Sequence, residues 1–352
     1  MIELREIESW DQYLPEFFFS HLGLRISDYE IDAVETGMMN FVFRVRTDKG
    51  IFFLKQALSK AKADRAMGPA LRTITSHRLE YERNCIAEIK SFPLDGIKIP
   101  TVHHYDPANK ILLLSDVAGK DGKLLETSLL EGVFDTSTAS AVGRFLGVMH
   151  RRSWGSKKYI RGSRSKDFKN WERFLDMRTK GTTVVWSDSD ISEALHDLYK
   201  QTLRHHSHDV LIWMDCCPKN IVVRKDRKIG VFDFELASWV GDPAYDLGFF
   251  IGHYLIQAIL QNSLTAALQA IAGSIQAYYC EVKDMPFQSG LMKRVLKFAA
   301  ATIFYRIAGA SRFTYLLPES VPQLIKKAKK LLYFGCQGEP DKVIAKIAQA
   351  LA

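Results

Sequence analysis

The sequence predicts an α+β protein with two lobes: a small N-terminal lobe of five strands and one main helix, then a larger, mostly helical C-terminal lobe. Strand-like stretches gather in the first third of the chain, whereas helical periodicity prevails from about residue 136 onward. The 352 residues suffice for two buried cores. Hydrophobic residues make up 47% and charged residues 25%, as in ordinary globular proteins.

The predicted N-terminal lobe covers residues 1–114. One or two short helices come first, with Phe17–Phe19 as an apolar face. Strands are expected at Tyr29–Glu35, Asn40–Thr47, Ile51–Ala57, Pro100–Tyr105 and Ile111–Leu114. The second and third strands are joined by Asp48-Lys49-Gly50, which is typical of a hairpin turn. A helix over about 69–89 follows the third strand.

A polar stretch with two glycines, residues 115–123, is the predicted hinge between the lobes. The C-terminal lobe then covers residues 124–352. Helices are expected at about 136–153, 168–178, 190–206, 244–260, 263–282, 289–312, 321–333 and 339–351. A short hairpin interrupts them, with strands at Asn220–Arg224 and Lys228–Phe232.

Charge and cysteine content limit the classes of partner. The formal net charge of +8 suits phosphate-bearing substrates as well as nucleic acid, but the basic residues are spread along the chain, which argues against nucleic acid. The densest run, 326–330, fits the solvated face of a helix. Five cysteines, an odd number without a CxxC pair, predict reduced thiols in the cytoplasm.

The sequence predicts no membrane association. Acidic residues stand near the N-terminus, where a signal peptide would carry cations and then an apolar stretch. The longest apolar run, Leu247–Leu260, is interrupted by His253 and Gln257 and is too short to span a bilayer. We therefore expect this run to be a buried helix.

The segment around the second hairpin carries the chemistry. Asp215 and Asn220 have the D-x-x-x-x-N spacing of a kinase catalytic loop, and Asp233 ends the apolar strand that follows. Phosphoryl transfer needs a carboxylate that orients the acceptor hydroxyl and takes its proton, together with oxygen ligands for Mg²⁺. These three residues supply both, which predicts phosphoryl-transfer chemistry.

The first lobe should then provide a cation for the nucleotide phosphates. Lys55 stands at the end of an apolar strand and can pair with the α- and β-phosphates. A glutamate on the following helix should hold this lysine, and Glu82 is the first candidate and Glu80 the second. The turn at 36–40, which contains Gly37, could lay backbone N–H groups over the phosphates.

Three motifs together resemble the aminoglycoside phosphotransferase and choline kinase superfamily, which has a protein-kinase-like fold. In matching order they are Asp215-x-x-Pro218-x-Asn220-Ile221, Val231-Phe232-Asp233-Phe234-Glu235 and Gly241-Asp242-Pro243-Ala244-Tyr245-Asp246-Leu247. The resemblance runs from about residue 30 to 250. Within the superfamily, two stretches look most like 5-methylthioribose kinase: Asn40–Val45 with Lys55–Leu58, and Tyr305–Ala310.

The resemblance implies a kinase that uses ATP and Mg²⁺, with Asp215 as the catalytic base. The implied metal ligands are Asn220, Asp233 and Glu235. The implied nucleotide-binding residues are Lys55, Glu82, Gly37, Asn40, Ser115, Asp116 and Val117, the last three through backbone groups that face adenine. The candidate acceptor-binding residues are Arg306, Arg312 and Trp239.

Trp213 and Met214 depart from the family pattern. Trp213-Met214 stands where the family usually has His-Gly, which leaves the geometry of the catalytic loop and the level of activity open. Glu235 fits the Asp-x-Glu pattern of methylthioribose kinases, whereas the stretch at 241–243 follows the broader superfamily. Asp242 precedes Pro243 and is expected to cap a helix.

The C-terminal helices predict a small hydroxyl acceptor that is neutral or anionic, such as a sugar. From Pro243 onward there are six acidic and 12 basic residues, whereas aminoglycosides and choline are cations that need carboxylates or aromatic cages. Arg306 or Arg312 would donate to the acceptor hydroxyls. Protein acceptors are disfavoured because no activation segment with Ala-Pro-Glu follows Asp233.

Other functions stay open at the level of sequence. The chain could be an aminoglycoside or other amino-alcohol phosphotransferase, or a nucleotide-binding pseudokinase scaffold, for which Trp213-Met214 is the reason. A protein that binds nucleic acid and merely keeps the fold is a third alternative. The oligomeric state is also open, a homodimer included.

Overall fold

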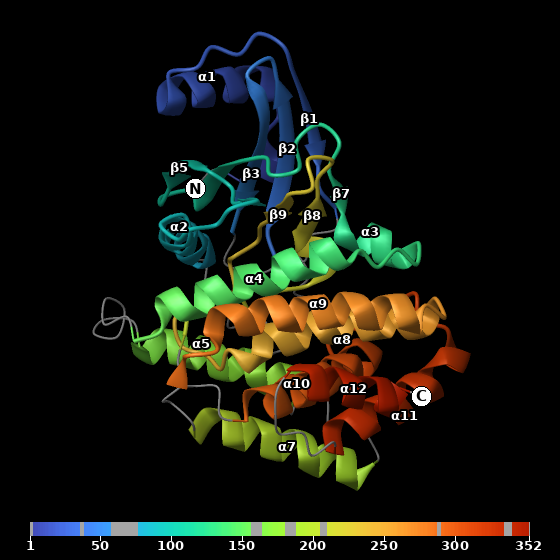
Figure 1. Cartoon of the computed structure of the whole chain (residues 1–352). Coiled ribbons are helices and arrows are strands. Elements are labelled where there is room, and N and C mark those ends of the chain that lie inside the picture. The colour runs from blue at the N-terminus through green and yellow to red at the C-terminus, as the bar shows by residue number, and fades with distance from the viewer. Residues whose placement is uncertain are drawn as a thin grey trace. The chain divides into compact units, whose positions relative to one another are not determined.

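A computed structural model of the chain describes residues 3–35, 39–57, 77–155, 164–179, 188–204, 210–286, 290–333 and 340–351. The chain forms two compact units. The first unit comprises Met1–Ser91, Ile99–Gly119 and Phe232–Leu236. The second comprises Phe92–Lys98, Lys120–Val231 and Ala237–Ala352. The predicted α+β class is confirmed, with a sheet-rich N-terminal part and a helical C-terminal part (Figure 1).

The first unit is built on a five-stranded antiparallel sheet with the order β1-β2-β3-β6-β5. The strands are β1 (Tyr29–Ala33), β2 (Phe41–Thr47), β3 (Gly50–Gln56), β5 (Val102–Asp106) and β6 (Ile111–Ser115). All five predicted strands are therefore present, with ends shifted by one or two residues. The expected hairpin turn also forms, because Thr47 pairs with Gly50.

Helices α1 (Trp10–Leu22) and α2 (Arg78–Ile89) use opposite faces of this sheet. Side chains alternate along a strand, so Leu54 and its even-numbered neighbours face α1, where Phe18 packs in the core. Lys55 lies on the opposite face and reaches Glu82 of α2. The apolar face expected at Phe17–Phe19 is correct for the first two residues only, because Phe19 is 52% exposed.

The second unit is mostly helical. Its helices are α3 (Leu125–Leu130), α4 (Thr136–Ser153), α5 (Arg164–Arg178), α7 (Ser189–Arg204), α8 (Ala244–Leu260), α9 (Leu264–Val282), α10 (Leu291–Ala308), α11 (Val321–Tyr333) and α12 (Pro340–Leu351). A small sheet has the order β4-β9-β8-β7. Its strands are β4 (Ile97–Lys98), β7 (Lys123–Leu124), β8 (Ile221–Val223) and β9 (Ile229–Val231). The predicted hairpin is confirmed as β8 and β9.

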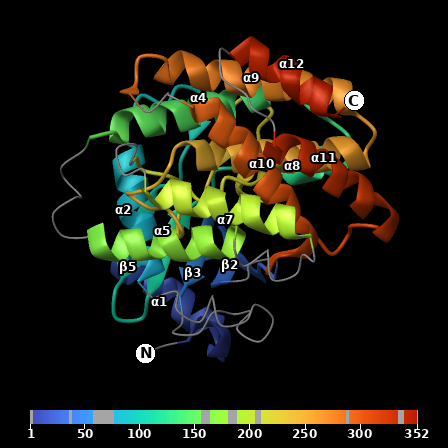
Figure 2. The same ribbon diagram turned by 90° about the horizontal axis from the view of Figure 1, so that it is seen from below.

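Glycines let the helices of this unit approach closely. Helices α4 and α9 lie side by side in both views, and α8 packs on α10 (Figures 1 and 2). A Cβ atom at Gly143 of α4 would lie 2.0 Å from the carbonyl oxygen of Ser274 in α9, so no larger residue fits without a shift. Helix α8 is buried around nearly its whole circumference, as its apolar sequence predicted.

Two further expectations concern membrane-spanning helices and the cysteine thiols. No described helix has the length and hydropathy that crossing a membrane requires. Cys85, Cys216, Cys217 and Cys280 all carry free thiols. Three of these thiols are buried in the protein interior.

Candidate active site

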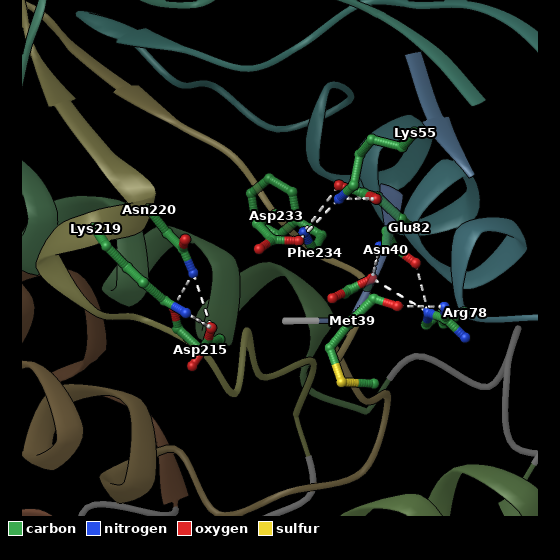
Figure 3. A network of polar contacts seen from close by, with 11 residues as sticks. Met39, Asn40, Lys55, Arg78, Glu82, Asp215, Lys219, Asn220, Asp233 and Phe234 are labelled. Carbon is green, nitrogen blue, oxygen red and sulfur yellow. Dashed lines mark hydrogen bonds and ion pairs between the residues drawn. The ribbon is translucent and has the colours of Figure 1, made fainter. Parts of the chain in front are cut away.

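A lysine cluster forms in the first unit from residues that are far apart in sequence. The Nζ atom of Lys55 lies 2.7 Å from Oε2 of Glu82 and 2.9 Å from Oδ1 of Asp233 (Figure 3). Glu82 is therefore the partner of the lysine, as first expected. Glu80, the second candidate, is half-buried, and its carboxylate lies 3.4 Å from Nδ1 of His77 instead.

Burial and charge act against each other in this cluster. Burial favours the neutral amine of Lys55, but the attraction of Asp233 and Glu82 prevails and raises its pKa, so the ammonium ion persists. Burial raises the pKa of Glu82, while Lys55 and the N–H group of Phe234, 3.2 Å from Oε1, oppose this effect. The cluster is a buried cation held between two carboxylates, and the Asp233 side chain keeps 26% exposure.

Asp233 itself has a strained backbone, because its φ of 67° lies in the left-handed region. For a residue with a side chain this region costs about 1–2 kcal/mol. Such conformations persist where surrounding contacts fix them, and they concentrate at functional sites. The contacts of Lys55 and of the following Phe234 fix this one.

Glu235 lies in a second network of the first unit. The amide Nδ2 of Asn40 donates a hydrogen bond to Glu235, and Nε of Arg78 lies 2.6 Å from Oδ1 of Asn40 and 3.6 Å from Glu235 (Figure 3). Arg78 also donates to the carbonyl of Met39 at 2.8 Å. Burial and the charge of Asp233 raise the pKa of Glu235 to about 7. Asn40 thus positions Glu235, and Gly37 lies outside the described residues.

Arg78 was not among the predicted site residues. Its position on α2 carries a signal that points to it, since it stands one helical turn before Glu82 and therefore shares the inward face. An arginine on an inward face requires a carboxylate partner. Glu235 is that partner.

In the backbone segment expected to face adenine, Ser115–Val117, two N–H groups already donate hydrogen bonds within the protein. The N–H group of Ser115 donates to Thr101 at 2.9 Å, and that of Asp116 donates to Ile51 at 3.1 Å. A bound base would have to use other backbone groups of this segment, because these two donors already have acceptors. Val117, the third predicted residue, is buried.

An aspartate cluster forms in the second unit. The Nδ2 atom of Asn220 lies 2.9 Å from both the main-chain oxygen and Oδ2 of Asp215 (Figure 3). Lys219 lies 3.6 Å from Oδ2, and Arg178 lies 2.9 Å from Oδ1. Burial would raise the pKa of Asp215, but Lys219, Arg178 and Arg306 hold it well below its usual range. The carboxylate is therefore ionised at neutral pH.

The residues before Asp215 replace the His-Gly of the family. Trp213 is fully buried and meets Phe145 edge to face at 5.6 Å, so the indole fills core space. Met214 has a φ of 65°, the left-handed conformation that a glycine would adopt with little cost. The backbone at this position is therefore strained in Met214.

Asp246, which belongs to the third sequence motif, braces this strained segment. Its carboxylate accepts the N–H groups of Trp213 at 2.7 Å and Met214 at 2.8 Å. His150 of α4 lies 3.2 Å from the same carboxylate and 2.9 Å from the hydroxyl of Tyr278. Three helices thus fix the loop through one buried carboxylate.

The three candidate acceptor residues have different environments. Arg306 is 7% exposed; its Nε lies 3.0 Å from Nε2 of His253, and its Nη1 lies 2.8 Å from the Ser311 carbonyl. Arg312 is exposed, and Trp239 is half-buried. Asp242 accepts the N–H of Ala244 at 3.0 Å, as expected of a capping residue, but helix α8 begins at Ala244 with Pro243 at the N-cap position.

The donor set fits magnesium better than a softer metal. Within the described ranges, no group of three or more His, Cys, Asp or Glu side chains is arranged to hold a metal ion. The candidates Asp233, Glu235 and Asn220 offer only carboxylate and amide oxygens. Magnesium is typically held by one or two carboxylates together with substrate phosphates and water, so the two carboxylates of the first unit, Asp233 and Glu235, suit a Mg-nucleotide.

Comparisons with known proteins agree with this chemistry. A family model described as the phosphotransferase enzyme family matches residues 30–282. A provisionally assigned aminoglycoside phosphotransferase from Ralstonia eutropha has a TM-score of 0.55 at 13% identity, over 96% of this chain and 97% of that one. Ethanolamine kinase from Plasmodium vivax has a TM-score of 0.51 at 10% identity, over 92% of this chain and 82% of that one. At such identities the two structures bear on the fold alone. No curated protein matches the chain significantly.

Proposed function

Because the chain belongs to the phosphotransferase enzyme family, we propose that it transfers the γ-phosphoryl group of Mg-ATP to a hydroxyl of a small, sugar-like metabolite. The resemblance to the superfamily seen in the sequence is confirmed at the family level. The closer resemblance to 5-methylthioribose kinase stays a prediction. The ion-pair cluster of Lys55 with Glu82 and Asp233 carries the proposal.

In the proposed mechanism the lysine cluster receives the nucleotide. Lys55 is a cation whose side chain is fixed by Glu82. It can therefore donate to phosphate oxygens with little further loss of conformational entropy. In the first unit, Asp233 and Glu235 would hold magnesium, which would supply charge neutralisation on the phosphates when it is bound. Most of the catalysis would come from positioning and electrostatic stabilisation, as is general for phosphoryl transfer.

Asp215 would act on the acceptor. Its carboxylate is fixed at one oxygen by Arg178 and at the other by Asn220, so its orientation is set before substrate arrives. It would accept a hydrogen bond from the acceptor hydroxyl and take the proton as the new P–O bond forms. A low pKa suits this role where the proton leaves late, after the hydroxyl has begun to bond to phosphorus.

Charge supports a neutral or anionic acceptor over a cationic one. Lys219 and Arg178 both lie within 4 Å of the Asp215 carboxylate, and Arg306 adds a further positive charge to its surroundings. A cationic acceptor would have to approach Asp215 against these charges. This argument favours a sugar-like compound over an aminoglycoside, choline or ethanolamine.

A screen of acceptors tests the proposal. Purified protein with Mg-ATP is assayed for ADP formation with 5-methylthioribose, ribose, kanamycin, choline and ethanolamine. We expect the fastest turnover with a neutral sugar and none for Asp215→Asn. Faster turnover with kanamycin or ethanolamine would refute the charge argument while leaving the kinase assignment intact.

A pseudokinase is the second candidate, and Trp213-Met214 is the observation that favours it. Under this alternative the protein binds Mg-ATP but turns over no acceptor. A rise in melting temperature with Mg-ATP, combined with no ADP formation across a wide acceptor panel, would support it. The ionised state of Asp215 and its bond to Asn220 favour the active enzyme.

A further inference from the structure

Arg178 is a buried arginine that neither the sequence motifs nor the family match assigns. It is the last residue of α5, whose inward positions Trp171, Phe174, Leu175 and Arg178 follow helical spacing. Only 6% of Arg178 is exposed. Its guanidinium lies 4.3 Å from the ring centre of Phe249, which supports the flat face of the group.

The guanidinium contacts the catalytic loop at two consecutive residues. Nη1 donates to the carbonyl oxygen of Met214 and to the hydroxyl of Tyr245. Nη2 lies 2.9 Å from Oδ1 of Asp215. One rigid planar group therefore fixes both the peptide before the candidate base and the base itself, which a lysine could not do.

Met214 explains why such a contact is needed. Its left-handed backbone is strained for a residue with a side chain, so it persists only if neighbouring groups hold it. Asp246 holds its N–H group at 2.8 Å, and Arg178 holds its carbonyl oxygen. Charged, buried side chains therefore fix the backbone on both sides of the strained residue.

We propose that Arg178 is a positioning residue for Asp215: it keeps the Met214 peptide in its left-handed conformation and aims the Asp215 carboxylate at the acceptor hydroxyl. The proposal rests on the proposed kinase function. Loss of Arg178 should reduce the chemical step and leave both substrates bound.

A double-mutant cycle tests the coupling between Arg178 and Met214. The variants are Arg178→Gln, Met214→Gly and the pair, with kcat and KM measured separately for ATP and the acceptor. We expect Arg178→Gln to lower kcat about 30-fold while both KM values stay within threefold of the wild type. The double variant should have a kcat at least fivefold higher than that of Arg178→Gln alone. Arg173→Gln, on the exposed side of α5, is the matched control and should behave as the wild type.

Three outcomes would overturn the proposal: no rescue by Met214→Gly, a rise in acceptor KM with kcat intact, or a loss of melting temperature with normal kcat. If Arg178→Gln does not fold, Arg178→Lys replaces it in the cycle. If the wild type turns over no acceptor, the proposed function fails. The positioning role is then tested by the crystal structure of the Arg178 variant. An unchanged φ of Met214 and an unchanged rotamer of Asp215 would contradict this role.

Discussion

Lys55 and Asp215 have separable roles at the scale of single residues. Lys55 is tied to the first unit by ion pairs with Glu82 and Asp233, whereas Asp215 belongs to a cluster of the second unit. Asp215→Ala should lower kcat by about 10³-fold or more, because it removes the proposed proton acceptor, while ATP still binds. Lys55→Ala should weaken both ATP binding and turnover.

Isothermal titration with ATP analogues, together with steady-state kinetics, measures the two effects. Lys55→Ala also leaves Glu82 buried beside Asp233 without its cation, so its free energy of unfolding should fall by about 3 kcal/mol. Lys49→Ala, an exposed lysine on the same hairpin, is the control. Near-normal activity of Asp215→Ala would show that the base has been assigned wrongly.

The raised pKa of Glu235 leads to a prediction about how the Mg²⁺ requirement depends on pH. If Glu235 holds Mg²⁺ as proposed, its pKa of about 7 means that a proton and Mg²⁺ compete for the carboxylate near neutrality. The fraction ionised falls about tenfold from pH 8 to pH 6, so the Mg²⁺ requirement at saturating ATP should rise about tenfold over that range. Glu235→Gln should weaken Mg²⁺ binding and flatten the pH dependence. An equally steep dependence in this variant would assign the proton to the nucleotide.

The residue-scale contacts were only partly predictable from sequence. Lys55 and Glu82 could be paired in advance because strand alternation and helix periodicity each fix one inward position. Arg178 and Asp246 could not, since their contacts depend on how helices distant in sequence pack around residues 213–215. An inward arginine on α5 is a signal of a buried partner, but it does not say which residue that partner is.

At the scale of elements, α4 and α9 pack closely against each other, and Gly143 permits this approach. Gly143→Ala should cost about 1–3 kcal/mol of unfolding free energy, because a methyl group meets the Ser274 carbonyl at 2.0 Å and outweighs the better helix propensity of alanine. Urea denaturation measures the change. Arg152→Ala, exposed on the same helix, is the control, and equal stability of the two variants would contradict the packing argument.

The long elements were predictable from their periodicity, and the two-residue strands were not. Helices α4, α8 and α11 begin and end as their periodicity indicates. Strands β4 and β7 have two residues each, too few for any period to appear, and they exist because β9 and β8 offer them hydrogen-bonding edges. The helix expected over 289–312 ends earlier, at Ala308, where Gly309 follows.

At the scale of the whole molecule, the first unit is not a continuous stretch of sequence. Truncating the chain after the N-terminal lobe would remove part of this unit. The first unit takes Phe232–Leu236 from a distant part of the chain. This five-residue piece carries Asp233 and Glu235, the partners of Lys55 and Arg78. The N-terminal portion alone therefore contains two buried cations whose carboxylates lie elsewhere in the sequence, although Glu82 remains for the lysine.

A fragment of residues 1–119 should therefore be less stable than its apolar core suggests and should not bind Mg-ATP. A peptide of residues 228–240, added in excess, should restore part of its stability, because the carboxylates return to the buried cations. The same peptide with Asp233→Asn and Glu235→Gln is the matched control. Thermal melts and ATP titrations of fragment, fragment with peptide and full chain measure this. Cooperative folding and full ATP affinity of the fragment alone would mean that the lysine site needs nothing from the later sequence, and the role given to Asp233 would then be wrong.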